Sequence, residues 1–410
     1  MPAATSITPV ASTKRAKVSV FTLTQATYYG RQLIKFGSIT LVVLIVGRML
    51  LTAAIAYWQA THPEPPPPPT IGFGKLPALV FPEVLDESKP QTYLLELPNG
   101  EFSEFVDRAK VFLMPKTPPN LLADQKIKEL AKEYDFTDEP QLLDSRTYRW
   151  TKSQPLEMGF QMDLLNHTFS LRSNYLSRTD LLLNNELPED FEAVSSVKTI
   201  LSAADMLPED VATTSGKVSF WKSLGGELQS AVSLSDADFL RVDLDRLPID
   251  DQFSMYSPDG SRGSISAVIS GSKSIDGGVV ELEYHYFPVD YTQVETYPLR
   301  TPQDAWKILQ AGEGYVAHAS TFPEVTVRSV DLGYYDDWQE QDYLQPIYVF
   351  EGDGGFVGYV SAIKSQFILS PAASEVLDTP AILDTPATLE APAALETPAS
   401  LETPTDSEAI

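Results

Sequence analysis

Two acid-rich stretches are the densest groups of residues in this sequence that could do chemistry. Carboxylates gathered this closely can bind calcium, and two of them, one with a raised pKa, can act as an acid–base pair. Neither stretch has the D-x-D-x-D-G order of a calcium loop, so solvated acidic faces are the simplest interpretation, and both alternatives stay open. The first stretch holds Asp243, Asp245, Asp250 and Asp251, and the second holds Asp336, Asp337, Glu340 and Asp342.

Other reactive groups are scarce. The chain has no cysteine, which excludes disulfides, thiolate metal sites and a cysteine nucleophile. Its four histidines are not spaced to present two metal ligands, and His285 falls on the polar side of an alternating strand, where a rim position is expected. No G-x-S-x-G, H-E-x-x-H, Walker or G-x-G-x-x-G pattern occurs. We therefore predict no catalytic residue, no cofactor and no metal ligand.

An apolar run from Phe36 to Trp58 has the length that a helix needs to cross a bilayer, about 20 residues. Basic residues are concentrated before this run, so the positive-inside rule places residues 1–32 in the cytoplasm and the bulk of the chain outside the cell membrane. Ala54–Ala56 resembles a signal-peptidase site, but the run and its lead are too long for a cleavable signal. We predict an uncleaved, single-pass transmembrane helix at residues 33–58.

Arg48 lies near the middle of the apolar run. A charge at that depth costs about 2.5–3.5 kcal/mol on insertion scales. One interpretation is a contact with a polar group on a partner helix, and the other is an isolated charge that the flanking apolar residues tolerate. Arg48 is the candidate partner contact in the membrane.

Charge divides the chain at the same boundary. Residues 1–59 hold six basic residues and no acid, whereas the whole chain has a net charge of −26. An acidic body repels phosphate backbones and anionic head groups, so we expect it to bind neither nucleic acid nor a lipid surface. The oligomeric state stays open.

The remaining chain divides into four parts. Proline-rich residues 59–90 predict a stiff stalk in the polyproline II conformation. Short strands mixed irregularly with helices then predict an α+β class, with two domains of antiparallel sheet plus helix at residues 91–212 and 213–370. A six-residue repeat with regular prolines and no lysine or arginine fills residues 371–410 and predicts a disordered acidic tail.

Three local signals are specific. Residues 190–206 carry apolar side chains, including Phe191, at three- and four-residue intervals, which predicts one buried helical face. Thr301 has the position of an N-cap before Pro302, and Trp306 is expected to anchor the core from the helix that follows. The glycines of residues 352–355 predict a turn between two paired strands.

Residues 301–363 contain the segments TPQDAWKILQAGEG, VTVRSVDLGYYD and YLQPIYVFEGDGGFVGYVSAI. This region resembles the C-terminal module of YycH/YycI-type proteins, although Tyr348 stands where that family tends to have tryptophan. The resemblance implies a PepSY-like extracytoplasmic fold, an inside N-terminus, and restraint of a cell-envelope sensor kinase through membrane and ectodomain contacts. It implies no catalytic site.

We therefore expect a membrane-anchored extracytoplasmic regulatory or interaction protein of the bacterial cell envelope, without catalytic activity, whose partner is another membrane protein. The alternative is a membrane-tethered extracytoplasmic hydrolase or glycan-binding protein. A deep cleft lined by paired buried carboxylates favours the enzyme, whereas an exposed apolar or acidic face favours binding.

Overall fold

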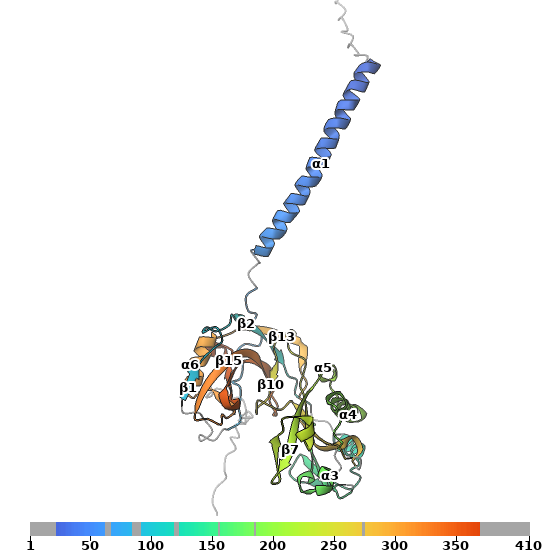
Figure 1. The fold of residues 1–410 in the computed structure, drawn as a ribbon, viewed down its shortest axis with the longest axis vertical. Helices are drawn as coiled ribbons and strands as arrows, with labels where there is room; N and C mark the ends of the chain where they lie inside the picture. Colours follow the sequence, from blue (N-terminus) through green and yellow to red (C-terminus); the bar gives the residue numbers. More distant parts are fainter. Residues whose placement is uncertain are drawn as a thin grey trace, which may run out of the picture. The chain divides into compact units, whose positions relative to one another are not determined.

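The structure is a computed structural model (Figure 1), in which the predicted α+β class is confirmed: one long apolar helix precedes sheets with a few helices. The predicted tail lies outside the described residues, as do the start of the basic segment and two parts of the stalk. Two compact units, Met1–Pro68 and Pro69–Ile410, are described separately. The structure describes residues 22–61, 67–83, 92–118, 123–154, 156–183, 186–272 and 275–369.

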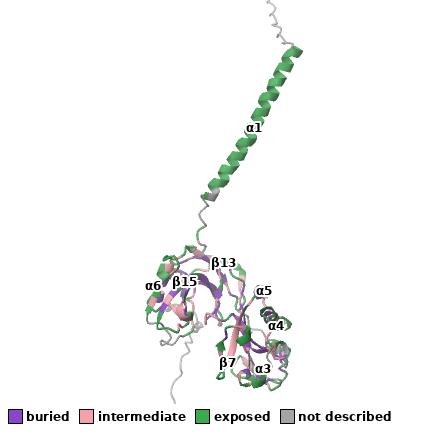
Figure 2. Cartoon of the chain, in the orientation of Figure 1, coloured by how far each residue is buried: buried purple, intermediate pink, exposed green. Residues whose placement is uncertain are grey.

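Helix α1 (Leu23–Thr61) has 39 residues, which at 1.5 Å per residue gives a length of about 58 Å. It begins before the predicted span at residues 33–58, so part of the predicted cytoplasmic segment is helical. Leu23–Trp58 is long and apolar enough to cross a membrane, and its side chains are exposed throughout (Figure 2). This finding is consistent with single-pass anchoring. Arg48 lies on the exposed surface of α1.

The stalk predicted at residues 59–90 is corrected over its later part, which packs onto the globular unit. Leu76 is fully buried and forms a parallel bridge with Ile368. The ring of Phe81 stacks on that of Tyr315, with 4.8 Å between ring centroids. Burying these apolar side chains is favourable, whereas an exposed stalk would leave them in water. The chain therefore joins the globular unit well before residue 90.

A nine-stranded antiparallel sheet forms one part of the globular unit, in the order β3-β4-β5-β6-β12-β11-β9-β7-β8. Helices α2 (Ala123–Glu133) and α4 (Asp190–Ala203) contribute buried apolar residues to its core. Two short helices, α3 (Thr179–Leu183) and α5 (Glu209–Ala212), precede and follow α4 in the chain. The strands are β3 (Gln141–Leu142), β4 (Thr147–Lys152), β5 (Met158–Asp163), β6 (Phe169–Ser173), β7 (Lys217–Leu224), β8 (Glu227–Ser230), β9 (Phe239–Leu244), β11 (Ile265–Ser270) and β12 (Val279–Tyr284).

An eight-stranded sheet forms the other part. Its main path is β1-β15-β16-β17-β14, with β10 beside β15, and with β2 between β13 and β16. Strands β1 and β10 run parallel to β15, and the other pairs are antiparallel. The strands are β1 (Thr92–Leu95), β2 (Arg108–Leu113), β10 (Met255–Tyr256), β13 (Asp290–Pro298), β14 (Tyr315–His318), β15 (Glu324–Tyr335), β16 (Tyr343–Gly352) and β17 (Val357–Ser361).

The strand pairing corrects the predicted division into residues 91–212 and 213–370. The nine-stranded sheet combines β3–β6 from the first predicted domain with strands from the second, and β6 pairs with β12. Conversely, β1 and β2 belong to the eight-stranded sheet. The chain therefore passes between the two sheets four times, because strand pairing joins segments that are far apart in the sequence.

Local signals mostly predicted the elements correctly. Helix α6 (Pro302–Gln310) begins after Thr301, whose hydroxyl accepts a hydrogen bond from the Asp304 amide at 3.2 Å. Trp306 is buried against Phe350, as predicted, and the turn near residues 352–355 joins β16 to β17.

Helix α4 has the predicted buried face, with one exception. Val194, Val197 and Leu201 are buried, but Phe191 is 81 % exposed. Phe191 lies in the first turn of α4, at the end of the buried face. The prediction that it is helical is confirmed, and the prediction that it is buried is wrong.

Candidate functional site

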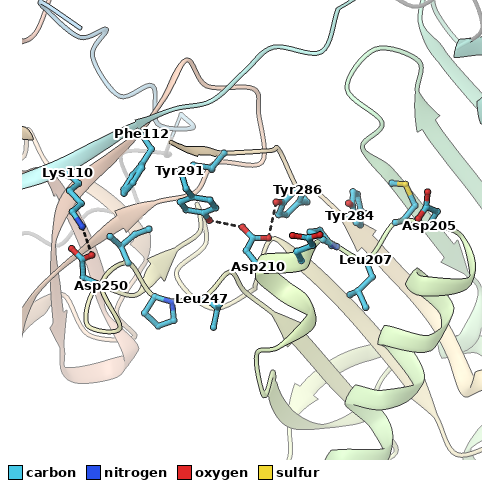
Figure 3. A pocket seen from close by; sticks show the side chains of 16 residues that line it. Lys110, Phe112, Asp205, Leu207, Asp210, Leu247, Asp250, Tyr284, Tyr286 and Tyr291 are labelled. Carbon is cyan, nitrogen blue, oxygen red and sulfur yellow. Dashed lines mark hydrogen bonds and ion pairs between the residues drawn. The ribbon is translucent and has the colours of Figure 1, made fainter. Parts of the chain in front are cut away.

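A pocket of about 800 Å³ opens between α5, the segment after β9 and the start of β13 (Figure 3). We call it the tyrosine pocket. Its wall combines aliphatic and aromatic side chains with a few charged groups, which is the usual composition of a ligand site. The lining residues are Lys110, Phe112, Asp205, Met206, Leu207, Pro208, Glu209, Asp210, Leu247, Pro248, Ile249, Asp250, Tyr284, Tyr286, Val289 and Tyr291.

Asp210 organises the polar side of the tyrosine pocket. The hydroxyls of Tyr286 and Tyr291 donate hydrogen bonds to its two carboxylate oxygens, at 2.9 and 2.7 Å (Figure 3). Burial raises the pKa of both phenols, so they stay protonated and keep donating. At another side of the pocket, Lys110 Nζ pairs with Asp250 Oδ1 at 2.5 Å. These contacts fix the polar groups before any ligand arrives.

Arg246 lies directly behind this wall, and its side chain is fully buried. The guanidinium pairs with Asp336 at 2.9 Å and with Asp210 at 3.1 Å, and it also donates to the carbonyl oxygen of Phe287. It lies 4.0 Å from the ring centroid of Tyr286, a cation–π contact. Burial alone disfavours the charged guanidinium, but Asp336, Tyr286 and Asp210 raise the pKa of Arg246. Arg246 therefore joins α5, the segment after β12 and the end of β15.

The two acid-rich stretches of the sequence meet at this arginine. Asp245 precedes Arg246 along the chain, and Asp336 comes from the second stretch. Burial, followed by repulsion from Asp336 and Asp243, raises the pKa of Asp245 to about 7. Burial also raises the pKa of Asp337, to about 6. Two stretches predicted as solvated faces thus contribute buried carboxyl groups to one junction.

Asp243 is buried and pairs with Arg241, whereas Asp250, Asp251, Glu340 and Asp342 behave as predicted for solvated acids. Asp250 and Asp251 occupy a turn with positive φ angles of 54° and 57° and remain exposed. Asp342 pairs with Lys116 at 2.9 Å near the surface, and Glu340 is exposed. Within the described part of the chain, no group of three or more histidine or acidic side chains has an arrangement suited to a metal ion.

His285, predicted as a rim residue, lies at the edge of the same junction. The ring of His285 stacks on Trp338 with 5.4 Å between centroids, and its Nε2 lies 3.4 Å from Glu283. Its side chain is 26 % exposed, which matches the predicted rim position. Arg48, the candidate partner contact, belongs to the unit Met1–Pro68, and its role stays a prediction.

Sequence reasoning missed the residues that build the pocket. Asp210 comes from α5, Tyr286 from the segment between β12 and β13, and Tyr291 from the start of β13, and nothing in their spacing joins them. One signal was present, since Arg246 stands among acids in VDLDRLPIDD. An arginine within an acidic, otherwise apolar segment is suited to a buried ion pair.

The arrangement is suited to recognition. Its central carboxylate is held by Arg246 and two phenols, and no serine, threonine or cysteine lines the tyrosine pocket beside a base. Asp243, Asp245 and Asp336 are not among the lining residues. Of the carboxylates around Arg246, Asp210 alone therefore lines this pocket.

Comparison with known proteins gives no family. No protein-family model matches the chain, and no curated protein matches it. Among solved structures, the Bacillus megaterium YpeB C-terminal domain aligns with a TM-score of 0.29 and 12 % identity, over 61 % of this chain and 95 % of that one. An uncharacterised protein from Eubacterium rectale aligns with a TM-score of 0.32 and 11 % identity, over 67 % of this chain and 90 % of that one.

Proposed function

We propose that this protein is a membrane-anchored interaction protein of the bacterial cell envelope, which regulates another membrane protein by binding it and catalyses no reaction. In this proposal the N-terminus is cytoplasmic, α1 is the anchor, and the globular unit lies outside the membrane. The similarity of residues 301–363 to YycH/YycI-type proteins supports a sensor kinase as the partner.

The tyrosine pocket is the observation that carries this proposal. Leu247 and Tyr291 are 43 % and 40 % exposed on its wall, although both are large and apolar in part. Next to them, Asp210 is already fixed by three hydrogen-bonding partners. A preformed wall of apolar surface and oriented polar groups lowers the entropy cost of binding a partner segment.

Site-specific photocrosslinking in native membranes tests the proposal. A photoreactive amino acid replaces Leu247 in the tyrosine pocket or, as a matched control, Leu142, an exposed leucine of β3 that is not among the pocket's lining residues. We expect Leu247 to capture an integral membrane protein several-fold more efficiently than Leu142, because buried apolar anchors dominate interfaces. Equal yields from the two positions contradict a role for the pocket.

The same experiment with Arg48→Leu tests the membrane contact separately. If Arg48 meets a polar group on a partner helix, the substitution lowers the yield from Leu247, because the anchor then no longer holds the partner nearby. An unchanged yield assigns Arg48 to the tolerated-charge interpretation and leaves the pocket proposal standing. If no membrane protein is captured in any arm, the regulatory proposal fails.

One observation favours the second candidate function, a membrane-tethered hydrolase or glycan-binding protein. Buried carboxyls lie close together at the junction, and the pKa of Asp245 is raised to about 7, as a general acid requires. An enzyme of this kind predicts that the full-length protein cleaves casein or peptidoglycan fragments, and that Asp245→Asn abolishes the cleavage. If the wild-type chain cleaves neither substrate, the hydrolase alternative is removed.

A further inference from the structure

The buried junction behind the tyrosine pocket has more negative than positive charge. Arg241 pairs with Asp243 at 3.1 Å, and Arg246 forms ion pairs with both Asp336 and Asp210. Asp245 forms no ion pair among the described residues. Four carboxyl groups thus share two guanidiniums. Burying an ionised carboxylate without a paired cation is costly, so the surplus charge favours uptake of a proton.

Asp245 is the carboxyl of this group without a paired cation among the described residues, so we assign the proton to it. It follows β9 directly, in register with Ser264 before β11, because Leu244 pairs with Ile265. Its carboxylate accepts a hydrogen bond from the Ser264 backbone. A Cβ on Gly263 would lie 2.6 Å from the Leu244 carbonyl oxygen and 2.9 Å from Asp245 Oδ1, so glycine allows the backbone to approach this carboxyl closely.

The charged groups that face Asp245 come from several elements. Asp243 faces it from β9, Lys217 from the start of β7, and Asp336 from the end of β15. His285, paired with Glu283, lies one strand further, since its amide donates to the Ser264 carbonyl at 2.8 Å. Arg246 follows Asp245 directly in the chain, and Asp337 follows Asp336. Lys217 is exposed to water, so it offsets little of the repulsion from the two aspartates.

We infer that the junction is a proton-operated latch: Asp245 takes up one proton as the medium becomes acidic, and the neutral carboxyl tightens the contact between the two sheets. Protonation removes the repulsion that Asp245 exerts on Asp243 and Asp336. Asp336 then remains fully available to Arg246, which joins the end of β15 to α5 and to the segment after β12.

The direction of the effect follows from the pKa of Asp245, which folding raises from 3.8 to about 7. A group with a raised folded pKa stabilises the fold most below its unfolded pKa, and this stabilisation is lost as pH rises through the folded pKa. The latch is therefore closed in mildly acidic medium and loosened above neutrality.

The latch reaches the tyrosine pocket through two direct connections. Leu247, the residue after Arg246, lines the pocket, and its amide donates to the Asp210 carbonyl at 2.9 Å. Asp210 itself binds Arg246 and lines the pocket as well. Regulation of partner binding by the latch rests on the proposed function, whereas the latch itself does not.

Hydrogen exchange of the full-length protein in nanodiscs tests the latch without a partner. The informative amides are those of Leu247 and Asp336, which donate to Asp210 and Tyr256, each at 2.9 Å. After correction for intrinsic exchange, we expect about tenfold stronger protection at pH 5.5 than at pH 8 in the wild type. Asp245→Asn, a neutral side chain of the same shape, should give equal protection at both pH values.

Two matched variants separate Asp245 from its titratable neighbours. His285→Gln should keep most of the wild-type pH effect, and Asp337→Asn should reduce it by less than Asp245→Asn does, because the pKa of Asp337 is raised less than that of Asp245. If Asp245→Asn keeps the full effect, or if either control abolishes it, the latch proposal is overturned.

A second measurement covers the case in which Asp245→Asn does not fold. Infrared difference spectroscopy of the wild type, with the aspartate carboxyl carbons labelled, should show a protonated buried carboxyl near pH 6. No such band overturns the proposal. If the latch is shown but photocrosslinking from Leu247 captures nothing at either pH, the proposed function fails and the latch stands.

Discussion

Two arginines of the globular unit each hold two carboxylates, and they differ chiefly in their exposure to water. Arg246 is fully buried with Asp336 and Asp210, whose side chains are 4 % and 13 % exposed. Arg328 pairs with Glu96 and Asp353, and its own side chain is 51 % exposed. The same ionic grouping thus occurs once behind a pocket and once on the surface. Water weakens the ion pairs of Arg328 and can solvate the separated charges. The charges around Arg246 are buried, so water cannot take the place of a lost partner.

The largest expected effect is at the buried arginine. Arg246→Met removes the cation but keeps much of the side-chain volume, so Asp336 and Asp210 are left buried without their partner. We expect a loss of about 3–5 kcal/mol in the free energy of unfolding. Urea denaturation of the full-length protein in detergent measures it. A loss below about 1 kcal/mol would mean that water reaches the junction, and would remove the contrast with Arg328.

The second effect depends on pH. Folding raises the pKa of Asp337 from 3.8 to about 6, so its contribution to stability is complete below the unfolded pKa and is lost as pH rises through 6. In the wild type the free energy of unfolding should therefore decline as pH rises through 6. Asp337→Asn should make this decline smaller by about 1–3 kcal/mol. Melting temperatures between pH 4 and 8 check this. Asp353 is the matched control, because its pKa is lowered by Arg328, so its titration has the opposite sign.

A smaller effect is expected at one phenol of the tyrosine pocket. Tyr286→Phe removes the hydroxyl that donates to Asp210 at 2.9 Å and keeps the ring over Arg246. We expect a loss of about 1 kcal/mol, the usual net value of one hydrogen bond. Tyr291→Phe removes a similar bond from a more exposed side chain and should cost less. The two variants, compared by urea denaturation, rank the burial of the two bonds.

The smallest effect is expected at the exposed arginine. Arg328→Met should leave the melting temperature close to that of the wild type, and added salt should reduce even this difference. Thermal denaturation at low and high salt measures both. A loss as large as that of Arg246→Met would show that the Arg328 grouping is not screened by water.

Local chemistry in the sequence predicted much of the fold. The start of helix α6 was predicted from Thr301, which caps it, and Pro302, which is its first residue. The hairpin of β16 and β17 follows from the glycines at its turn. Such signals act within one turn or one hairpin, so a single sequence contains them in full.

Long-range pairing was not predictable in the same way. Strand β12 pairs with β6 over a separation of about 110 residues, and this pairing corrects the predicted domain boundary near residue 212. The later part of the predicted stalk is likewise corrected, because Leu76 is buried against residues near the end of the globular unit. Composition describes a segment but does not say which distant segment covers it.

The sequence by itself determined the apolar helix, the acidic character of the body and the α+β class, because each depends on composition or on periodicity within a segment. The tertiary structure alone decided which acids are buried. Asp243 and Asp251 stand eight residues apart in the same stretch, yet Asp243 is 1 % exposed and Asp251 is exposed to water. Burial depends on what the rest of the chain places around a carboxyl, and burial sets its charge.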